Sequence, residues 1–207
     1  EAVRRDWGRD RSVIVCGSTH DGEESLLLGL FKDLSEQFPQ MLLVLAPRHP
    51  ERFDQVARLT VRSGFNMVRR SQQHGPIPDS VSVQIADTMG ELAMLYAAAD
   101  IAIVGGSLIR IKGIGGHNIL EPCAVGVPVI FGPYMRNFSE ISQLALARQA
   151  GFQIDGRETL KAQEYTLLRD ADLRATTGEN GIRMVSENTG ATDCTLKLIL
   201  PYLNQRN

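Results

Sequence analysis

Short, continuous runs of apolar residues, rich in Val and Ile, recur along the chain. They do not alternate between apolar and polar positions, which is typical of strands buried on both faces of a parallel sheet. The pattern predicts strands at residues 12–16, 41–46, 66–70, 81–85, 101–104, 129–131 and 152–154.

Segments with helical periodicity separate these runs. In residues 23–37, for example, Leu26, Leu30 and Leu34 recur at helical spacing, and Pro39 follows just past the end. Further helices are expected at 51–63, 89–99, 118–125 and 138–150. The last fifty residues are expected to be mostly helix, with a terminal helix at 191–203. The alternation of strand and helix predicts an α/β fold with a doubly wound, Rossmann-like parallel sheet and right-handed crossovers.

The length of 207 residues suits one large domain. Residues 1–11 hold four arginines and no apolar periodicity, so we expect a linker or a frayed helix there and a single domain over residues 12–207. The chain begins with Glu1 rather than Met, and we therefore expect it to be a piece of a longer protein.

Charge and composition exclude several classes of protein. There are 22 Lys and Arg against 24 Asp and Glu, so a generally basic nucleic-acid-binding protein is not expected. No run approaches the ~18 apolar residues of a membrane span. Cys16, Cys123 and Cys194 are widely spaced and lack CxxC spacing, which predicts reduced, mostly buried thiols rather than disulfides or a zinc site.

The loop after the first strand, residues 17–24, carries glycines and small hydroxyl side chains ahead of a helix. Its backbone amides, near Ser18 and Thr19, suit an anion bound at a helix N-terminus. Alternatively, Asp21 or Thr19 caps the helix, which is the commoner use of these residue types and is favoured for this loop taken alone.

The loop after the second strand presents an arginine between two prolines. Arg48 follows Pro47 at the predicted sheet edge, where its planar guanidinium would suit a phosphate or a carboxylate. An ion pair with a neighbouring surface acid is an equally weighted alternative.

Thr88 and Glu91 have the spacing of a capping box at the start of a helix. Gly90 would then lie in the first helical turn, where glycine costs ~1 kcal/mol relative to alanine. The missing side chain would let a nucleotide lie against the backbone.

A glycine-rich stretch at 105–116, with five glycines in twelve residues, precedes a short helix. Asn118 is a suitable N-cap for that helix, and Glu121 falls in its first turn, where a carboxylate can accept the hydroxyls of a ribose. Stabilisation of Glu121 by the helix dipole alone is the weaker alternative.

Other candidate sites are weak. Asp170 and Asp172 are expected to cap a helix rather than hold a metal. The four histidines lack an i, i+4 pair, so no zinc site is expected. Walker A and Gly-x-Gly-x-x-Gly patterns are absent, which argues against a dinucleotide site.

Taken together, seven short motifs indicate a family. They are Ser18-Thr19-His20-x-Gly22-Glu23-Glu24, Pro47-Arg48-His49-Pro50-Glu51-Arg52, Arg69-Arg70-Ser71, Asp87-Thr88-Met89-Gly90-Glu91-Leu92, Gly105-Gly106-Ser107, Gly115-Gly116-His117-Asn118-x-Leu120-Glu121-Pro122 and Pro128-Val129-x-Phe131-Gly132-Pro133. In this order, over about residues 13–151, they resemble the C-terminal half of the 3-deoxy-D-manno-octulosonic acid (Kdo) transferases of lipopolysaccharide synthesis.

This resemblance implies the C-terminal half of a GT-B glycosyltransferase, which binds the donor CMP-Kdo. It implies inverting transfer of Kdo to a lipid A precursor, with no metal and no cofactor, at the cytoplasmic face of the bacterial inner membrane. The other half would bind the lipid A precursor, supply the catalytic glutamate and associate with the membrane. The present chain is thus expected to bind CMP without catalysing transfer.

The resemblance also places the donor contacts. It implies CMP contacts at Pro47, Arg48, Met89, Gly90, Glu91, Asn118, Ile119, Leu120 and Glu121. Further donor contacts are expected at Ser18, Thr19, Gly105, Gly106, Ser107 and Asn137. Backbone amides near Thr88 and Gly106, together with Arg48, are expected to stabilise the departing phosphate.

The sequence departs from the family pattern at two places. Residues 109–114 lengthen the glycine-rich loop, and Tyr134 stands where a histidine is usual. Two alternatives remain open at this stage: a non-catalytic nucleotide-binding regulatory module, and an epimerase-like enzyme on the same fold.

Overall fold

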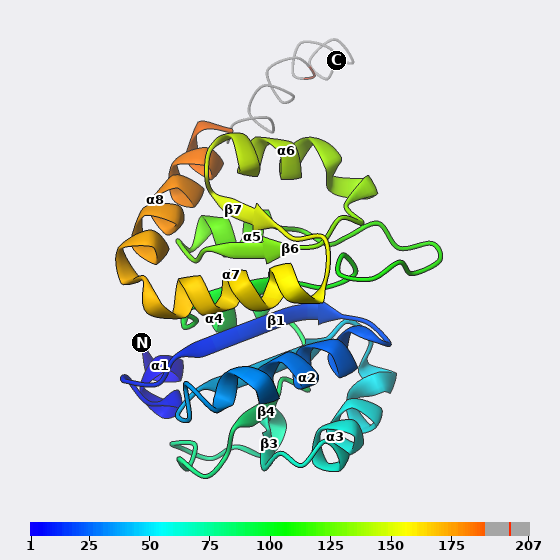
Figure 1. The fold of residues 1–207 in the computed structure, drawn as a ribbon, viewed down its shortest axis with the longest axis vertical. Coiled ribbons are helices and arrows are strands. Elements are labelled where there is room, and N and C mark those ends of the chain that lie inside the picture. Colours follow the sequence, from blue (N-terminus) through cyan, green and yellow to red (C-terminus); the bar gives the residue numbers. More distant parts are fainter. Residues whose placement is uncertain (189–198, 200–207) are drawn as a thin grey trace, which may run out of the picture.

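The computed structural model describes residues 1–188 and residue 199. Its centre is a seven-stranded parallel sheet in the order β3-β4-β2-β1-β5-β6-β7, flanked by helices (Figure 1). The strands are β1 (Val13–Thr19), β2 (Leu42–Pro47), β3 (Met67–Arg69), β4 (Val83–Ile85), β5 (Ile101–Val104), β6 (Val129–Phe131) and β7 (Gly151–Gln153). Each overlaps a strand expected from the sequence, and the doubly wound parallel sheet is confirmed.

The helices are α1 (Ala2–Trp7), α2 (Glu23–Ser35), α3 (Phe53–Arg62), α4 (Leu92–Ala97), α5 (Leu120–Ala124), α6 (Ser139–Ala147), α7 (Arg157–Arg169) and α8 (Ala171–Glu187), with 3-10 turns η1 (Pro50–Arg52), η2 (Arg70–Gln72) and η3 (Arg136–Phe138). All but α1 fall within helical regions expected from the sequence. The expected helix at 191–203 lies, apart from residue 199, outside the described residues.

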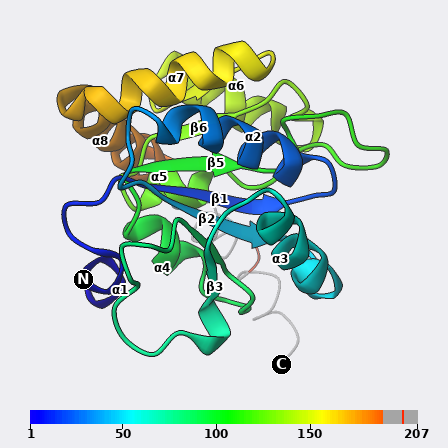
Figure 2. The same cartoon turned by 60° about the horizontal axis from the view of Figure 1, so that its bottom comes forward.

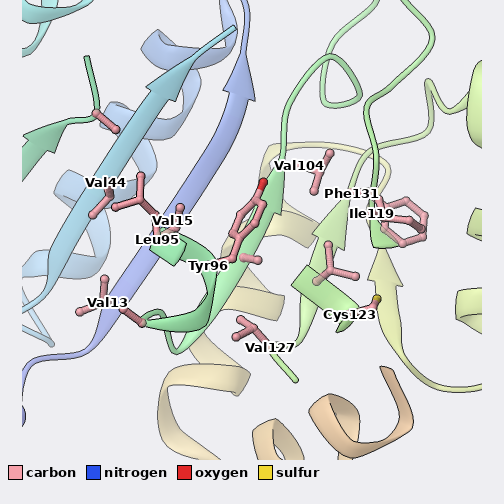
Figure 3. Close-up of a cluster of buried hydrophobic side chains, with 14 of the residues drawn as sticks. Val13, Val15, Val44, Leu95, Tyr96, Val104, Ile119, Cys123, Val127 and Phe131 are labelled. Atoms are coloured by element: carbon pink, nitrogen blue, oxygen red, sulfur yellow. The ribbon is translucent and has the colours of Figure 1, made fainter. Parts of the chain in front are cut away.

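Apolar side chains cover both faces of the sheet, which explains why the strand sequences do not alternate. Val13 and Val15 of β1 belong to one core cluster, with side chains from α1, α4, α5, α6 and α8. Ile14 and Cys16 belong to the other, with α2, α3 and α7. Figure 3 shows part of the first cluster, including Tyr96 of α4.

Residues 1–11 pack against the domain rather than trailing from it, which differs from the expected linker or frayed helix. Trp7 is fully buried, and its Nε1 donates to Gln84 Oε1 at 2.9 Å. Arg4 Nη1 donates to Asp100 Oδ2 at 2.9 Å. Only two apolar side chains anchor this helix, Val3 and Trp7, which is too few to produce a recognisable periodicity.

The sheet has a topological switch point between β1 and β5. From β1 the chain first builds β2 on one side and later returns to place β5 on the other. Ligands of open α/β sheets bind in the crevice beyond the carboxyl ends of the strands at such a point. The strand arrows in Figures 1 and 2 lead toward the side from which the loop after β5 projects.

The cysteine expectation is confirmed for the residues that are described, because Cys16 and Cys123 are buried free thiols. Cys194 lies outside the described residues. None of the helices within the described part of the chain combines the length and hydrophobicity needed to cross a bilayer.

Glu164 of α7 is a buried acid with no role at the sheet edge. Its side chain is 3% exposed, and Oε2 has no hydrogen-bond partner among the described residues. Burial raises the pKa of Glu164 to about 8. The carboxyl is therefore largely protonated at neutral pH.

We expect the stability of the protein to fall as the pH rises from about 5 to about 8, and Glu164→Gln to flatten that dependence. In the unfolded chain the pKa of a glutamate is about 4.3. At pH values between this pKa and that of the folded state, the folded protein therefore binds one more proton at Glu164 than the unfolded chain does. This favourable contribution, on the order of a few kcal/mol, is lost as the pH approaches the folded pKa. Urea unfolding at several pH values measures it, with the exposed Glu158→Gln of the same helix as control. Equal pH slopes for Glu164→Gln and the wild type would contradict the expectation.

Candidate functional site

A cavity of about 370 Å³ opens at the carboxyl edge of the sheet, beyond β1, β2, β4 and β5. Its volume falls within the roughly 300–1,000 Å³ typical of small-molecule sites. The lining residues are Ser18, Ala46, Pro47, Arg48, Ala86, Thr88, Met89, Gly90, Leu92, Leu95, His117, Asn118, Glu121 and Phe138. We call this the edge cavity. It brings together four loops that the sequence singled out separately.

Arg48 supplies the positive charge of the edge cavity. Its backbone amide donates to Thr19 O at 3.0 Å, which fixes the loop after β2 to the end of β1. Its exposed side chain makes no hydrogen bond or ion pair with any other residue that the structure describes. The alternative of a surface ion pair is therefore not realised, and the guanidinium fork is available to an anion.

The loop after β4 differs from the predicted capping box. Helix α4 begins at Leu92, its N-cap is Glu91, and no side chain caps it. The Glu91 carboxylate instead accepts from Arg70 at 3.2 and 3.3 Å and from the Thr88 hydroxyl. These bonds, with Arg70 the larger cause, lower the pKa of Glu91. An ion pair with two hydrogen bonds to a guanidinium is stronger than one hydrogen bond from a backbone amide, so the carboxylate binds Arg70. Glu91, a predicted CMP contact, does not line the edge cavity.

Gly90 lies ahead of α4 rather than in its first turn. Its φ of +81° falls in the left-handed region, which glycine adopts without strain. A Cβ atom there would meet nothing within 4 Å, so the residue leaves open space beside the backbone. Met89, 61% exposed, forms the adjoining part of the rim.

The short helix α5 presents two polar side chains to the edge cavity. The N-cap of α5 is Ile119, with no side-chain cap, so the predicted N-cap at Asn118 is wrong by one residue, although Asn118 Oδ1 accepts from the Leu120 amide at 3.0 Å. Asn118 Nδ2 donates to Glu121 Oε1 at 3.3 Å, which orients that carboxylate. Ile119 is fully buried and Leu120 packs against the core, so these two predicted contacts position the helix and do not line the cavity.

The amides of the loop after β5 are already bound to an internal anion. Glu23, fully buried at the start of α2, accepts from the amides of Gly106 at 2.8 Å, Ser107 at 3.1 Å and Leu108 at 3.0 Å. It also accepts from the His20 amide at 2.9 Å. Burial raises the pKa of Glu23, and the four amide bonds oppose that rise. The expectation that the Gly106 amide stabilises a departing phosphate is therefore wrong, because this donor is occupied.

The loop after β1 is likewise held by a carboxylate of α2. The N-cap of α2 is Gly22, with no side-chain cap, so the predicted caps Thr19 and Asp21 are wrong. Thr19 Oγ1 donates to the buried Glu24 at 2.8 Å, and Arg52 pairs with the same carboxylate at 2.6 and 3.0 Å. The Thr19 hydroxyl is therefore directed at the Glu24 carboxylate and not at the first amides of α2.

Apart from Ser18, the remaining predicted donor contacts shape the loops and do not line the edge cavity. Ser107 is fully buried, and its hydroxyl accepts from the Gly132 amide at 2.9 Å. A Cβ at Gly105 would lie 2.6 Å from Ser18 O, so glycine is required where the loops after β1 and β5 meet. Asn137 is exposed, and its amide donates to Gly115 O at 2.9 Å. Of this group only Ser18 faces the cavity.

Sequence reasoning missed a histidine pair that joins the same two loops. The Nε2 atoms of His20 and His117 lie 2.7 Å apart, so one of the two rings donates a hydrogen bond to the other. Burial, followed by the charges of His20 and Arg48, lowers the pKa of His117 to about 4. His117 is therefore neutral at physiological pH where it lines the cavity. The two residues are 97 positions apart, and no local pattern signals the contact.

Metal ligation finds no support in the described part of the chain, where no group of three or more His, Cys, Asp or Glu is arranged to hold an ion. Asp170 caps α8, as predicted, by accepting from the Leu173 amide at 2.8 Å.

The sequence is similar to 3-deoxy-D-manno-octulosonic acid transferases. It is 37% identical to that of Haemophilus influenzae over 206 residues, which are 99% of this chain and 47% of the relative. It is 35% identical to that of Bordetella pertussis over 196 residues, 93% of this chain and 45% of the relative. The chain thus spans about half the length of these curated relatives. No protein-family model matches it.

Solved structures agree with this similarity. The C-terminal CMP-Kdo binding domain of WaaA from Acinetobacter baumannii matches with a TM-score of 0.82 and 29% identity, over 89% of this chain and 94% of that one. The C-terminal domain of a group 1 glycosyl transferase (LpcC) from Francisella tularensis matches with a TM-score of 0.62 and 13% identity, which shows the fold alone. Over about half the length of these relatives, the chain is therefore a homologue of 3-deoxy-D-manno-octulosonic acid transferases, and it has the fold of the C-terminal half of a GT-B glycosyltransferase.

Proposed function

We propose that this chain is the donor-binding part of a Kdo transferase and that the edge cavity holds the cytidine monophosphate portion of CMP-Kdo. The observation that carries the proposal is the convergence of separate loops. Six of the nine predicted CMP contacts, namely Pro47, Arg48, Met89, Gly90, Asn118 and Glu121, line this one cavity. The name of the structural neighbour, a CMP-Kdo binding domain, supports the same assignment.

The chemistry of the lining suits the three parts of a nucleotide. The guanidinium of Arg48, unpaired within the described residues, suits the phosphate because it is permanently charged and can form two parallel hydrogen bonds. The Glu121 carboxylate, oriented by Asn118, suits the ribose hydroxyls. The apolar side chains of Leu92 and Leu95 offer a surface for the base.

In the proposed reaction, an acceptor hydroxyl attacks the anomeric carbon of Kdo on the face opposite CMP. The bond between that carbon and the phosphate oxygen breaks, CMP leaves with the bonding electrons, and the configuration inverts. Arg48 would offset the charge that develops on the departing phosphate. We assign no general base to this chain and propose that the rest of a longer protein supplies it.

The acceptor and the location belong to the same proposal. We propose that the longer protein transfers Kdo to a lipid A precursor at the cytoplasmic face of the inner membrane, and that the rest of that protein makes the membrane contact.

Calorimetric titration of the chain with CMP tests the proposal. We expect one binding site for CMP, and tighter binding of CMP-Kdo because the sugar adds contacts. Absence of heat and of any thermal shift at millimolar CMP would contradict the proposal. Equal affinity for CMP and CMP-Kdo would instead favour a nucleotide-binding regulatory module.

A further inference from the structure

The contact between His20 and His117 has a well-defined geometry. Their Nε2 atoms lie 2.7 Å apart, the ring centroids lie 5.0 Å apart, and the ring planes differ by 1°. Because the centroid separation exceeds the nitrogen separation by about twice the radius of an imidazole, the rings meet edge to edge and nearly in one plane. This arrangement aligns an N–H of one ring with the lone pair of the other, as a hydrogen bond requires.

This hydrogen bond couples the tautomers of the two rings. A neutral imidazole has one N–H donor and one acceptor nitrogen. The ring that accepts at Nε2 therefore carries its proton on Nδ1, whereas the ring that donates at Nε2 has an unprotonated Nδ1. Burial, the largest cause, lowers the pKa of both His20 and His117, which favours neutral rings. The pair thus has two states, which differ in the ring that offers an Nδ1–H.

Nδ1 is the nitrogen of His117 that remains for the edge cavity. Nε2 is bonded to His20, and the adjoining Cδ2 faces Gly106, where a Cβ atom would come within 2.7 Å of it. Within the described part of the chain, no hydrogen bond joins Nδ1 of His117 to another residue. His117 and Arg48 line the same cavity, and the positive charge of Arg48 acts on the His117 ring. A ring nitrogen and a guanidinium without internal partners therefore belong to one binding surface.

The charge of a ligand distinguishes between the two states of the pair. Phosphate oxygens only accept hydrogen bonds when the phosphate is ionised. They are repelled by the lone pair of an unprotonated Nδ1 and attracted by an Nδ1–H. A neutral His117 can carry the proton on Nδ1 when its Nε2 accepts, which requires His20 to donate from its own Nε2. A bound phosphate therefore favours the state in which His20 is the donor.

We propose that His20 is a positioning residue of the nucleotide site. By donating from its Nε2 to Nε2 of His117, His20 holds that ring in the tautomer that presents Nδ1–H to the phosphate of CMP. The inference rests on the proposed function for the identity of the anion. His20 is buried and does not line the edge cavity, so it acts through His117. The oriented N–H would act beside Arg48 on the charge that develops as CMP departs.

Proton–nitrogen NMR correlations of the histidine rings test the tautomers directly, because protonated and unprotonated ring nitrogens resonate at well-separated frequencies. In the wild-type chain saturated with CMP at neutral pH, we expect the proton of His117 on Nδ1 and that of His20 on Nε2. A CMP-saturated chain in which His117 is protonated on Nε2, or on both nitrogens, would overturn the proposal. This measurement needs no variant, so it decides the matter even if substitutions at His20 impair folding.

Two substitutions at His20 separate orientation from packing. His20→Leu keeps apolar bulk but removes the donor, and we expect it to weaken CMP binding by about 3–10-fold, the equivalent of one hydrogen bond. His20→Gln retains a side-chain N–H and is expected to recover most of that affinity. The control is His74→Leu, at an exposed histidine outside the edge cavity, which is expected to bind CMP as the wild type does. Equal losses in His20→Leu and His20→Gln, or no loss in His20→Leu, would refute the positioning role.

Calorimetry of the wild-type chain with CMP separates this proposal from the proposed function. CMP binding together with the opposite tautomer of His117 would refute the role of His20 and leave the nucleotide assignment intact. Absence of CMP binding would contradict both.

Discussion

Replacing Glu23 by alanine is expected to lower the free energy of unfolding by about 3–5 kcal/mol, which would unfold a marginally stable domain. The carboxylate accepts from four backbone amides, on the loops after β1 and β5. Its removal leaves buried donors without an acceptor, at ~1–3 kcal/mol each before the loops relax. Urea unfolding at neutral pH measures the loss.

Glu36→Ala, at the exposed C-cap of the same helix, is the matched control and is expected to change stability by less than about 0.5 kcal/mol. Glu23→Gln keeps one carbonyl acceptor and is expected to fall between the two, which retains enough folded protein for binding measurements. If Glu23→Ala were as stable as the control variant, the hydrogen bonds from the two loops to the carboxylate would not stabilise the fold as the contacts indicate.

Replacing Arg48 by alanine is expected to weaken CMP binding by about 1.5–3 kcal/mol, the value of a hydrogen bond to a charged group. This corresponds to ~10–150-fold in Kd. Because the side chain makes no hydrogen bond or ion pair with the described residues, its removal breaks no such interaction, and stability should stay unchanged. Calorimetry with CMP and thermal unfolding of the same samples separate the two effects.

Two further variants make the Arg48 result specific. Arg48→Lys keeps the charge but lacks the planar fork, so an intermediate affinity is expected. Arg58→Ala, an exposed arginine of α3 outside the edge cavity, is expected to bind CMP as the wild type does. CMP affinity unchanged in Arg48→Ala would remove this residue from the site.

The sequence predicted the sheet well because its signal is local and strong. Each strand is an uninterrupted apolar run that is covered on both faces, as Ile14 and Val15 illustrate by facing opposite clusters. Helix α1 was not predicted to pack against the domain because no comparable local signal marks it. Its attachment depends on one tryptophan and on the Arg4 bonds to Asp100, nearly a hundred residues away.

Within the site, the sequence predicted which loops converge but not which polar groups stay free. The exposure of Arg48, which has no polar partner among the described residues, follows from its local position after a strand, and the bond from the Leu120 amide to Asn118 follows from a position just ahead of a helix. The fates of Glu23 and Glu91 depend on distant partners, the amides after β5 and Arg70. The sequence alone does not show whether a carboxylate will bind a ligand or form hydrogen bonds that stabilise the fold.

The central claim is that CMP occupies the edge cavity, and a crystal structure of the chain grown with CMP tests it most directly. The account predicts the phosphate within about 3 Å of the Arg48 guanidinium, the ribose hydroxyls on Glu121 and the base against Leu92 and Leu95. Nucleotide density elsewhere on the surface, with the edge cavity holding only solvent, would contradict it.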